Sequence, residues 1–394
     1  MPLTEQRMDK LRILLIHNYY KIPGGEDSVF DNECKLLRDR GNEVFVYSRH
    51  NNELKASDLF FTAPFSGKTY SEVRKLIRDR DIDIVHLHND RFLISPSVYK
   101  AAFDEGVPIV QTLHNFRLLC INAMLTRDGA VCRDCLKKEG PVTGPALRHK
   151  CYRNSRLLTM LALRINKSAF RQDIFRKAYF ITLTEFNKKI FSESCIDEDR
   201  IFVKPNFTFS FCGDAGESAE RRDFILLGRI DPLKGIVEIL EEWKKIPEEN
   251  VLNIVGSGEE KFVKELKEKY PLKNVRFLGQ TDHDEALKLL RNSKAMIFAS
   301  RLYEGFPMTI IESFSCRTPV IGVDFGNGGD IIKKIYGCER PLMKDISELH
   351  ERIMNFDNDR AQGLYDFKEE NLKDYTPDGN YELLTEIYKK ILSY

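Results

Sequence analysis

The sequence feature that most constrains the fold is a regular alternation of short apolar runs with longer helix-like stretches. The runs are nearly continuous in Val, Ile, Leu and Phe, which is typical of parallel strands in a sheet covered on both faces. They fall at residues 12–18, 42–48, 83–89, 108–115 and 179–185, and again at residues 224–230, 251–258, 275–280, 294–300 and 319–326. Helix-like segments separate them, as at residues 27–41. The alternation predicts an α/β protein with doubly wound parallel sheets.

A break in this pattern predicts two domains. The chain has 394 residues, which allows two or three domains at roughly 150 residues each. The alternation lapses at residues 205–222, where small, polar and charged residues collect as in a linker. We therefore expect an N-terminal domain over residues 1–205, a C-terminal domain over residues 206–376 and a final helix over residues 377–394.

Composition excludes several classes of protein. The 61 Lys and Arg nearly balance the 60 Asp and Glu, so the chain as a whole is not a polyanion binder. No apolar run reaches the ~18 residues of a membrane span, and the N-terminus has no signal-peptide cleavage pattern. Five cysteines stand singly along the chain, at Cys34, Cys195, Cys212, Cys316 and Cys338. Such scattered cysteines favour a reducing compartment, and we expect a cytoplasmic protein.

Two carboxylates flank a short loop after the apolar run at residues 294–300. The loop and the helix after it contain, in order, Glu304, Gly305, Phe306, Pro307, Met308 and Glu312. Gly305 permits close backbone approach, and the helix N-terminus offers unpaired N–H groups to an anion. A nucleotide sugar combines a diphosphate for those N–H groups with hydroxyls for the carboxylates. The other interpretation is a solvated acidic loop followed by an unrelated helical glutamate.

A second pair of charges follows the run at residues 224–230. Arg229 and Lys234 flank a turn made by Asp231 and Pro232, just before a helix. Two cations at the carboxyl end of a strand are well placed to bind a pyrophosphate. Surface cations without a ligand are the alternative, and the presence of Glu304 and Glu312 in the same domain favours the binding site.

Glycines and histidines mark the strand ends of the N-terminal domain. Gly24 and Gly25 follow the first strand and could let the chain pass close to phosphate or sugar atoms. Their spacing is not G-x-G-x-x-G, which argues against a dinucleotide-binding oxidoreductase. Of the strand-end histidines His86, His88 and His114, the last lies where a parallel strand meets the ligand-binding edge. We expect His114 to donate a hydrogen bond to a sugar hydroxyl or a phosphate.

Taken together, these motifs resemble the family-4 retaining glycosyltransferases over nearly the whole chain. The resemblance implies the GT-B fold, with two Rossmann-like domains facing a central cleft and a C-terminal helix that crosses back onto the first domain. It implies a transferase that moves a sugar from a nucleoside diphosphate sugar to a hydroxyl acceptor and needs no cofactor for catalysis. The alternatives are a nucleotide-sugar epimerase of the same fold and a non-catalytic nucleotide-binding scaffold.

The resemblance also implies roles for individual residues. Glu312 would hold the ribose, Glu304 and the backbone of residues 305–308 the donor sugar, and Arg229 and Lys234 the diphosphate. His114 would touch the donor sugar, while Gly24 and Gly25 would approach the donor phosphate and the acceptor. Gly256 lies in a turn that resembles the family's VGxGxE motif, although the second glutamate falls at Glu260.

Four cysteines cluster in the N-terminal domain, within an insertion at residues 116–155. Cys120, Cys132, Cys135 and Cys151 are spaced as C-x11-C-x2-C-x15-C. A C-x2-C pair with two flanking cysteines suits a closed, structural zinc site with four thiolate ligands. Two disulfides and four free thiols are the alternatives.

A basic and apolar stretch overlaps the end of this insertion. Residues 148–177 carry nine Lys and Arg against one acid, Asp173, together with leucines at helical spacing. Such a helix can lie on an anionic membrane surface, or it can pack on its own domain with a solvated basic face. The membrane alternative fits a lipid-linked saccharide or a surface polysaccharide as the acceptor. Nucleic acid is not expected, because few aromatic residues accompany the charges.

Overall fold

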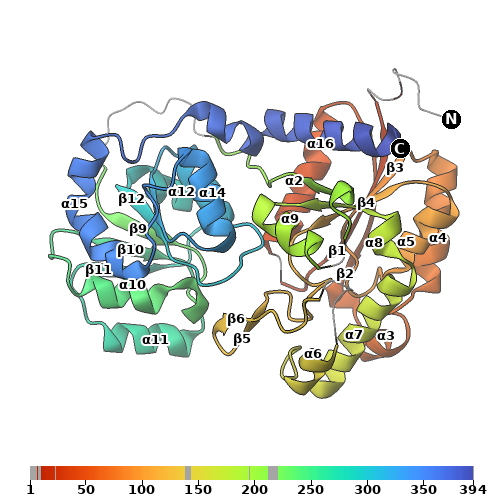
Figure 1. Cartoon of the computed structure of the whole chain (residues 1–394), viewed down its shortest axis with the longest axis horizontal. Coiled ribbons are helices and arrows are strands. Elements are labelled where there is room, and N and C mark those ends of the chain that lie inside the picture. Colours follow the sequence, from red (N-terminus) through yellow and green to blue (C-terminus); the bar gives the residue numbers. More distant parts are fainter. Residues whose placement is uncertain are drawn as a thin grey trace. The chain divides into compact units, whose positions relative to one another are not determined.

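The computed structural model describes residues 7, 10–22, 24–137, 143–194, 196–211 and 221–393. Cys195, Cys212 and part of the expected linker, residues 212–220, lie outside the described residues, as does most of the N-terminal segment before residue 10. The chain divides into two compact units, whose elements are labelled in Figure 1. The first comprises residues 1–125, 132–206 and 377–394, and the second comprises residues 126–131 and 207–376.

The first unit is built on a parallel six-stranded sheet. Its strand order is β2-β1-β3-β4-β7-β8. The strands are β1 (Arg12–Tyr19), β2 (Glu43–His50), β3 (Ile84–Asn89), β4 (Ile109–Leu113), β7 (Tyr179–Thr182) and β8 (Ile201–Val203). Every residue of β3 and β4 is buried, which explains why both read as continuously apolar or neutral runs.

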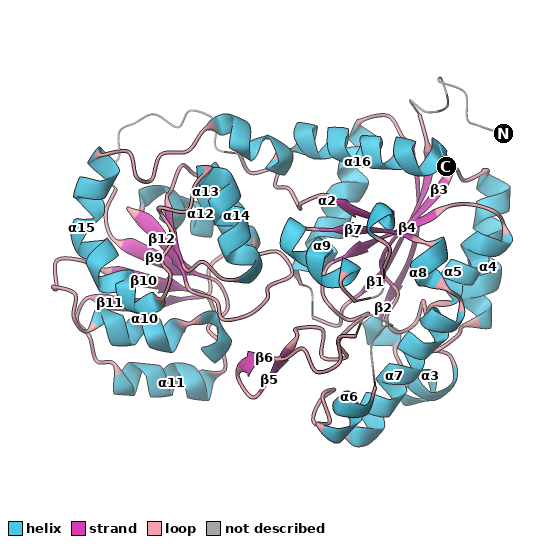
Figure 2. Ribbon diagram, in the orientation of Figure 1, coloured by secondary structure: helices cyan, strands magenta, loops and turns pink. Residues whose placement is uncertain are grey.

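Helices cover this sheet on both faces (Figure 2). The helices of this unit before the C-terminal one are α2 (Gly25–Asp39), α3 (Ala56–Phe61), α4 (Gly67–Arg80), α5 (Ser97–Asp104), α6 (Gly144–Arg148), α7 (Arg156–Arg171), α8 (Ile174–Lys177) and α9 (Glu185–Ser192). Serine begins two of them, because its hydroxyl accepts a hydrogen bond from an otherwise unpaired N–H of the first turn. Ser66 caps α4 through the Thr69 N–H, and Ser155 caps α7 through the Leu158 N–H.

The C-terminal helix α16 (Pro377–Ser393) belongs to the first unit. Leu384, Ile387 and Tyr388 share a buried cluster with Phe30 of α2 and with β1. Polar contacts fix the same helix, since the Asn42 amide donates to the Tyr381 hydroxyl at 3.0 Å and Lys204 donates to Asn380 at 2.9 Å. The helix therefore completes the core of this unit although it is distant in sequence.

The second unit has a parallel five-stranded sheet with the order β11-β10-β9-β12-β13. The strands are β9 (Phe224–Leu227), β10 (Leu252–Val255), β11 (Val275–Gly279), β12 (Ala295–Phe298) and β13 (Val320–Gly322). The helices are α10 (Ile236–Trp243), α11 (Glu260–Lys269), α12 (His283–Asn292), α13 (Met308–Ser315), α14 (Gly326–Tyr336) and α15 (Leu349–Ala361). Its core is one cluster in which Phe224 packs edge-on against Trp243 and Phe356.

The expected fold class is confirmed, since each predicted apolar run contains a strand of a parallel sheet. Two features differ from expectation. The edge strand β8 and a hairpin formed by β5 (Thr126–Arg127) and β6 (Ala130–Val131) were not predicted, because both are very short. The hairpin lies inside the cysteine-rich insertion, yet it groups with the second unit rather than the first. In the part of the chain that the structure describes, no helix has the length and hydropathy needed to cross a bilayer.

Candidate functional site

The charged residues singled out in the second unit follow two neighbouring strands. Arg229 and the short helix Pro232–Lys234 come after β9, and Glu304 comes after β12. Because β9 and β12 are parallel and adjacent in the sheet, their carboxyl ends meet at the same edge, where open α/β sheets bind ligands. Glu312 lies on α13, the helix that starts directly after the Glu304 loop.

Lys234 and Glu304 contact each other directly. The Lys234 ammonium donates a hydrogen bond to Oε1 of Glu304 and forms an ion pair with it. The Ser300 hydroxyl donates to the same oxygen at 2.6 Å. Both side chains keep contact with solvent, at 25% and 13% exposure. The pair is thus fixed in place and still open to a ligand.

Asn327, which the sequence motifs did not single out, holds the backbone of the Glu304 loop. Its side-chain amide donates to the carbonyl oxygens of Glu304 and Gly305, the latter at 3.3 Å. Asn327 is completely buried in the first turn of α14. The run Gly326-Asn327-Gly328-Gly329 after β13 was the available signal, because glycines at a strand-to-helix turn permit close packing.

Glycines let the strand-end turns of this unit approach one another. Gly256 has a φ of +140°, and a Cβ on it would lie 1.9 Å from the carbonyl oxygen of Gly228. Gly235 has a φ of +77°, and its Cβ would lie 2.1 Å from the carbonyl oxygen of Ala299. Packing within the protein therefore requires glycine at residue 256, whatever ligand the turn binds.

Glu312 faces a histidine that the sequence motifs also did not single out. Nδ1 of His283, the first residue of α12, lies 3.8 Å from Oε1 of Glu312. Burial raises the pKa of the Glu312 carboxyl above its usual range, and the nearby His283 partly offsets this effect. Pro307 precedes α13 and provides no side-chain cap, so the first N–H groups of that helix can bind an anion.

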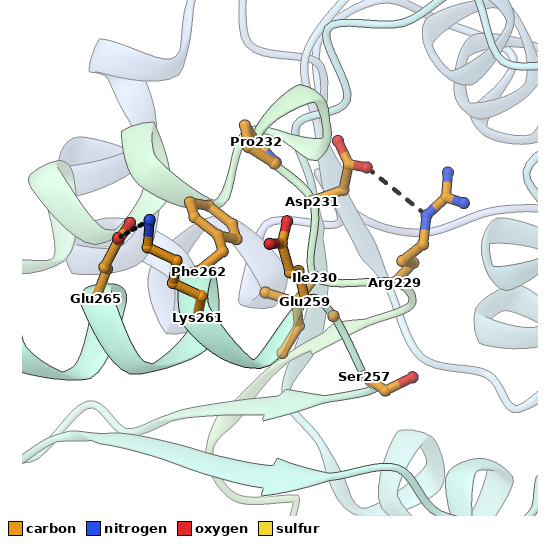
Figure 3. A pocket seen from close by; sticks show the side chains of 10 residues that line it. Arg229, Ile230, Asp231, Pro232, Ser257, Glu259, Lys261, Phe262 and Glu265 are labelled. Atoms are coloured by element: carbon orange, nitrogen blue, oxygen red, sulfur yellow. Dashed lines mark ion pairs between the residues drawn. The ribbon is translucent and has the colours of Figure 1, made fainter. Parts of the chain in front are cut away.

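Arg229 lines a separate pocket of about 480 Å³ between the β9 turn and the start of α11 (Figure 3). Its Nε lies 3.8 Å from Oδ2 of Asp231, and its side chain is 64% exposed. Ser257 and Glu259 contribute from the turn after β10. Lys234, Glu304 and Glu312 do not line this pocket. The structure thus joins Lys234 to Glu304, while Arg229 and Glu312 have other partners.

The glycine pair of the first unit borders open space. Gly24 and Gly25 lie at the start of α2, and a Cβ on either would meet no atom within 4 Å. Gly24 is in an extended conformation, with φ of −135°, which any residue can adopt. Neither backbone strain nor packing explains the glycine at residue 24, in contrast to Gly256.

His114 follows β4, is half-buried and contacts a row of buried polar side chains. Its Nε2 is 3.0 Å from Nδ1 of His88, whose Nε2 is 3.1 Å from Oε1 of Glu33 on α2. Burial lowers the pKa of His88 to about 4, although Glu33 opposes this effect. Burial and the neighbouring His88 lower the pKa of His114 well below its usual range. Both imidazoles are therefore neutral at pH 7.

A small pocket lies beside His114 at the carboxyl ends of the first unit's strands. Glu26, Asp90, Arg91 and Arg117 line it together with His88 and His114. Burial raises the pKa of Glu26 to about 7, against the opposing charge of Arg117. The Tyr20 hydroxyl donates to Glu26 at 2.7 Å. The pocket has a volume of only about 30 Å³, and charged and polar side chains line much of it.

The four clustered cysteines lie near one another. Cys120 and Cys135 are buried, and Cys132 and Cys151 are half-buried thiols. Burial, together with the charges of the other three thiolates, raises the pKa of Cys135 to about 11. Within the described residues, however, no three of these sulfurs lie within 4.8 Å of one another.

The basic stretch includes the helices α7 and α8, of which α7 is the longer. Leu161, Ala162 and Ile165 of α7 are buried against its own unit, whereas Leu157 is 51% and Met160 45% exposed. Part of the apolar face is therefore packed, and part of it remains on the surface of the helix.

Two protein-family models match the chain. The model described as "Glycosyltransferase Family 4" matches residues 23–208. The model described as "Glycosyl transferases group 1" matches residues 213–363. Together the two matches cover most of both units.

Individual relatives agree with these matches. The chain is 23% identical over 343 residues to a phosphatidyl-myo-inositol mannosyltransferase of Mycolicibacterium smegmatis, which covers 80% of this chain and 76% of the relative. It is 21% identical over 358 residues to an uncharacterized glycosyltransferase of Methanocaldococcus jannaschii, covering 88% and 89% of the two chains.

Solved structures share the fold. A glycosyltransferase from Rickettsia africae superimposes with a TM-score of 0.68 at 17% identity, over 98% of this chain and 99% of the other. Anabaena HepE in complex with UDP and glucose superimposes with a TM-score of 0.65 at 16% identity, over 96% and 100%.

Proposed function

This chain belongs to the group 1, family 4 glycosyltransferases, and from that premise we propose that it transfers a sugar from a nucleoside diphosphate sugar to a hydroxyl acceptor with retention of anomeric configuration. The acceptor in this proposal is a lipid-linked or surface-polysaccharide saccharide. The single observation that carries the proposal is the Lys234–Glu304 pair, which places a cation and a carboxylate together at the carboxyl edge of the second sheet.

The charges at this edge match the charges that the reaction develops. Cleaving a sugar–phosphate bond builds negative charge on the diphosphate and positive charge on the sugar ring. Lys234 and the N-terminus of α13 stabilise the leaving diphosphate, with Arg229 as a second cation. Glu304, held by Lys234 and Ser300, keeps its remaining acceptor capacity for donor-sugar hydroxyls.

Glu312 binds the ribose hydroxyls in this proposal. Its carboxylate is largely buried, 16% exposed, and lies opposite His283. A buried carboxylate gains more from a charge-assisted hydrogen bond than an exposed one, because water competes less for its oxygens. HepE binds UDP and glucose in its own complex, which supports a nucleoside diphosphate in the second unit of this chain.

Donor turnover tests this function. The full-length enzyme is incubated with UDP-glucose, UDP-galactose or GDP-mannose and a short-chain polyprenyl-linked saccharide, and release of the nucleoside diphosphate is measured. The proposal expects release with at least one donor and a product whose anomeric configuration, read by NMR, equals that of the donor. Inversion would contradict retention, and a donor isomerised without any acceptor would indicate an epimerase.

A peripheral contact with anionic membranes is part of the proposal for a lipid-linked acceptor. Exposed Leu157 and Met160 lie on α7 among basic residues, and each basic residue near an anionic surface contributes about 1 kcal/mol. The enzyme should co-sediment with vesicles rich in phosphatidylglycerol and not with pure phosphatidylcholine. The Leu157→Ser/Met160→Ser variant should lose this binding, while Leu278→Ser, at a 44% exposed residue of the second unit, should keep it. Equal binding by both variants would contradict a role for α7.

We also propose that the four clustered cysteines bind one structural zinc ion, which would draw their sulfurs together. Their mutual effect on thiol pKa values supports a common location. Elemental analysis should find one zinc per chain, lost in Cys132→Ser and kept in Cys338→Ser, a matched change at a half-buried cysteine of the second unit. Metal-free protein whose four thiols all react with an alkylating agent would contradict the proposal.

A further inference from the structure

We infer that Glu33, acting through His88, fixes His114 in the tautomer that carries its proton on Nε2 and leaves Nδ1 as a hydrogen-bond acceptor for a sugar hydroxyl. The tautomer follows from the geometry of the first unit alone. Only the identity of the ligand, a sugar hydroxyl, rests on the proposed function. Glu33 and His88 are positioning residues, since they act through His114.

The three side chains form a continuous hydrogen-bonded row. Glu33 comes from the middle of α2, His88 from the end of β3 and His114 from the end of β4. Glu33 is completely buried and His88 is 2% exposed. The two links measure 3.1 Å from Glu33 Oε1 to His88 Nε2 and 3.0 Å from His88 Nδ1 to His114 Nε2. Each ring is neutral at pH 7 and therefore carries one N–H and one lone pair.

The Glu33 carboxylate, at one end of the row, determines which ring nitrogen of His88 and of His114 carries the proton. An ionised carboxylate only accepts hydrogen bonds, so the Glu33–His88 link requires the proton on Nε2 of His88. Nδ1 of His88 is then a lone pair, and the 3.0 Å link requires His114 to donate from Nε2. Nδ1 of His114 therefore has no proton. Among the described residues, no hydrogen bond to this nitrogen is found, and His114 lines the polar pocket at the strand ends.

Glu33 is held in its ionised form by Lys204. Burial alone would favour the neutral acid, but the charge of Lys204, followed by the contacts with His86 and His88, keeps the pKa of Glu33 well below its usual range. The Lys204 ammonium, itself 1% exposed, lies 2.9 Å from Oε2 of Glu33. A buried charge of this kind persists only with such a partner.

His86 completes the surroundings of Glu33. Its Nδ1 lies 3.1 Å from Oε1 of Glu33 and 2.6 Å from the Tyr388 hydroxyl of α16. Its Nε2 lies 2.8 Å from the Thr112 hydroxyl, which can donate to it. A proton on Nδ1 of His86 is shared between the Tyr388 hydroxyl and Oε1 of Glu33, which both accept from it. Glu33 thus accepts from two imidazoles and pairs with one ammonium.

The same cluster has the composition of a metal site, since Glu33, His86 and His88 offer three ligand atoms within 4.8 Å. A metal ion would need both histidine lone pairs directed at it. It would also have to share Glu33 with the Lys204 ammonium 2.9 Å away, which like-charge repulsion disfavours. The hydrogen-bonded arrangement has no such conflict.

The fixed tautomer changes the chemistry expected of His114. The sequence suggested a hydrogen-bond donor for a hydroxyl or a phosphate. With Nε2 occupied by His88 and Nδ1 unprotonated, the side chain accepts from a hydroxyl and repels a phosphate oxygen. His114 therefore selects a sugar hydroxyl over the diphosphate as its partner.

The tautomer can be measured without substrate. The full-length protein, labelled with 15N in its histidine rings, is studied by NMR at pH 7, and the His114 signals are assigned by their loss in His114→Asn. The inference expects an unprotonated Nδ1 and a protonated Nε2 for His114. A protonated Nδ1 would overturn the inference. So would a stoichiometric metal ion that Cys132→Ser retains and His88→Asn loses.

A paired variant tests the role of Glu33. Glu33→Gln/Lys204→Met removes both buried charges together, so that neither is left without its partner, and the introduced amide can either donate to or accept from His88. His114 should then populate both tautomers, whereas Glu53→Gln/Lys75→Met, at exposed residues of the same unit, should leave it unchanged. A single, unchanged tautomer in the folded paired variant would overturn the inference.

Kinetics provides a separate readout. If the proposed function holds, kcat/KM of the paired variant should fall roughly three- to tenfold, the effect expected for one lost hydrogen bond to a neutral group. An altered tautomer with unchanged kcat/KM would leave the tautomer assignment intact and contradict the sugar contact. Absence of turnover in the wild-type enzyme itself would contradict the proposed function and not the tautomer.

Discussion

The ammonium group of Lys234 and the carboxylate of Glu304 form an ion pair, although 70 residues of chain separate them. Lys234 ends the short helix after β9, and Glu304 lies in the loop after β12. Adjacent parallel strands bring the two loops together, and Gly235 lets their backbones touch. Both residues were singled out from the sequence, they are in contact in the structure, and both have a role in the proposed reaction.

Replacing Lys234 should impair the chemical step. Lys234→Met removes the cation proposed to stabilise the leaving diphosphate, and we expect kcat to fall about 100- to 1000-fold. Lys264→Met is the matched control, because Lys264 is 78% exposed on α11. Steady-state kinetics with the preferred donor makes the comparison. A kcat within twofold of wild type would remove Lys234 from the mechanism.

Donor binding should depend on the protonation of Glu312. Burial raises the pKa of this carboxyl, and a proton on it removes an acceptor for the ribose hydroxyls. Affinity for the nucleoside diphosphate should therefore be full above the raised pKa and should fall as the pH decreases through it. Calorimetry over a pH series measures this effect.

The Glu312→Gln variant provides the control for that pH series. We expect about ten- to hundredfold weaker binding at neutral pH, the range for a lost hydrogen bond to a charged group, together with a flatter pH dependence. Glu285→Gln, at an exposed residue in the first turn of α12, should bind as wild type does. Unchanged affinity in Glu312→Gln would exclude the ribose contact.

Folding stability should decrease in mildly acid solution because of His88. Its pKa is about 4 in the folded protein and about 6.5 when unfolded. The unfolded chain therefore binds more protons between these values. The contribution of the neutral His88 to the free energy of unfolding is full above pH 6.5. About 3 kcal/mol of that free energy is lost as the pH falls through 4.

Urea unfolding at several pH values measures this effect. His88→Asn should show a smaller decrease in unfolding free energy between pH 6.5 and 4 than the wild-type protein. His149→Gln, at an exposed histidine of the same unit, should follow the wild-type curve. Parallel curves for all three proteins would mean that His88 is not the group responsible.

Two glycine substitutions should separate a packing role from a ligand role. Gly256→Ala places a Cβ 1.9 Å from a carbonyl oxygen at a φ of +140°, so we expect a loss of several kcal/mol in unfolding free energy. Gly24→Ala meets no atom within 4 Å and should fold within about 0.5 kcal/mol of wild type. If a ligand approaches Gly24, its KM should nevertheless rise. Wild-type KM values in Gly24→Ala would contradict that approach.

The sequence predicted the sheets well because parallel strands buried on both faces are nearly continuous in apolar residues, as at residues 13–16 of β1. It also predicted the residues at strand ends in the second unit, since their spacing is local. It missed Glu33, because in the sequence this residue is an ordinary polar residue of a helix. Only the fold brings Lys204 and His88 from distant segments into contact with it. It missed Asn327 for the same reason, because its role depends on a loop from another strand.

Binding of nucleoside diphosphates tests the central claim most directly, namely that the strand-end residues of the second unit bind an activated sugar donor. The thermal unfolding midpoint of the full-length protein is measured with UDP, GDP, ADP and CDP, since a ligand that binds only the folded state raises its stability. We predict a saturable increase with at least one of them, reduced in Glu312→Gln and in Lys234→Met but unchanged in Lys264→Met. No increase with any nucleotide, or equal increases in all four proteins, would contradict the claim.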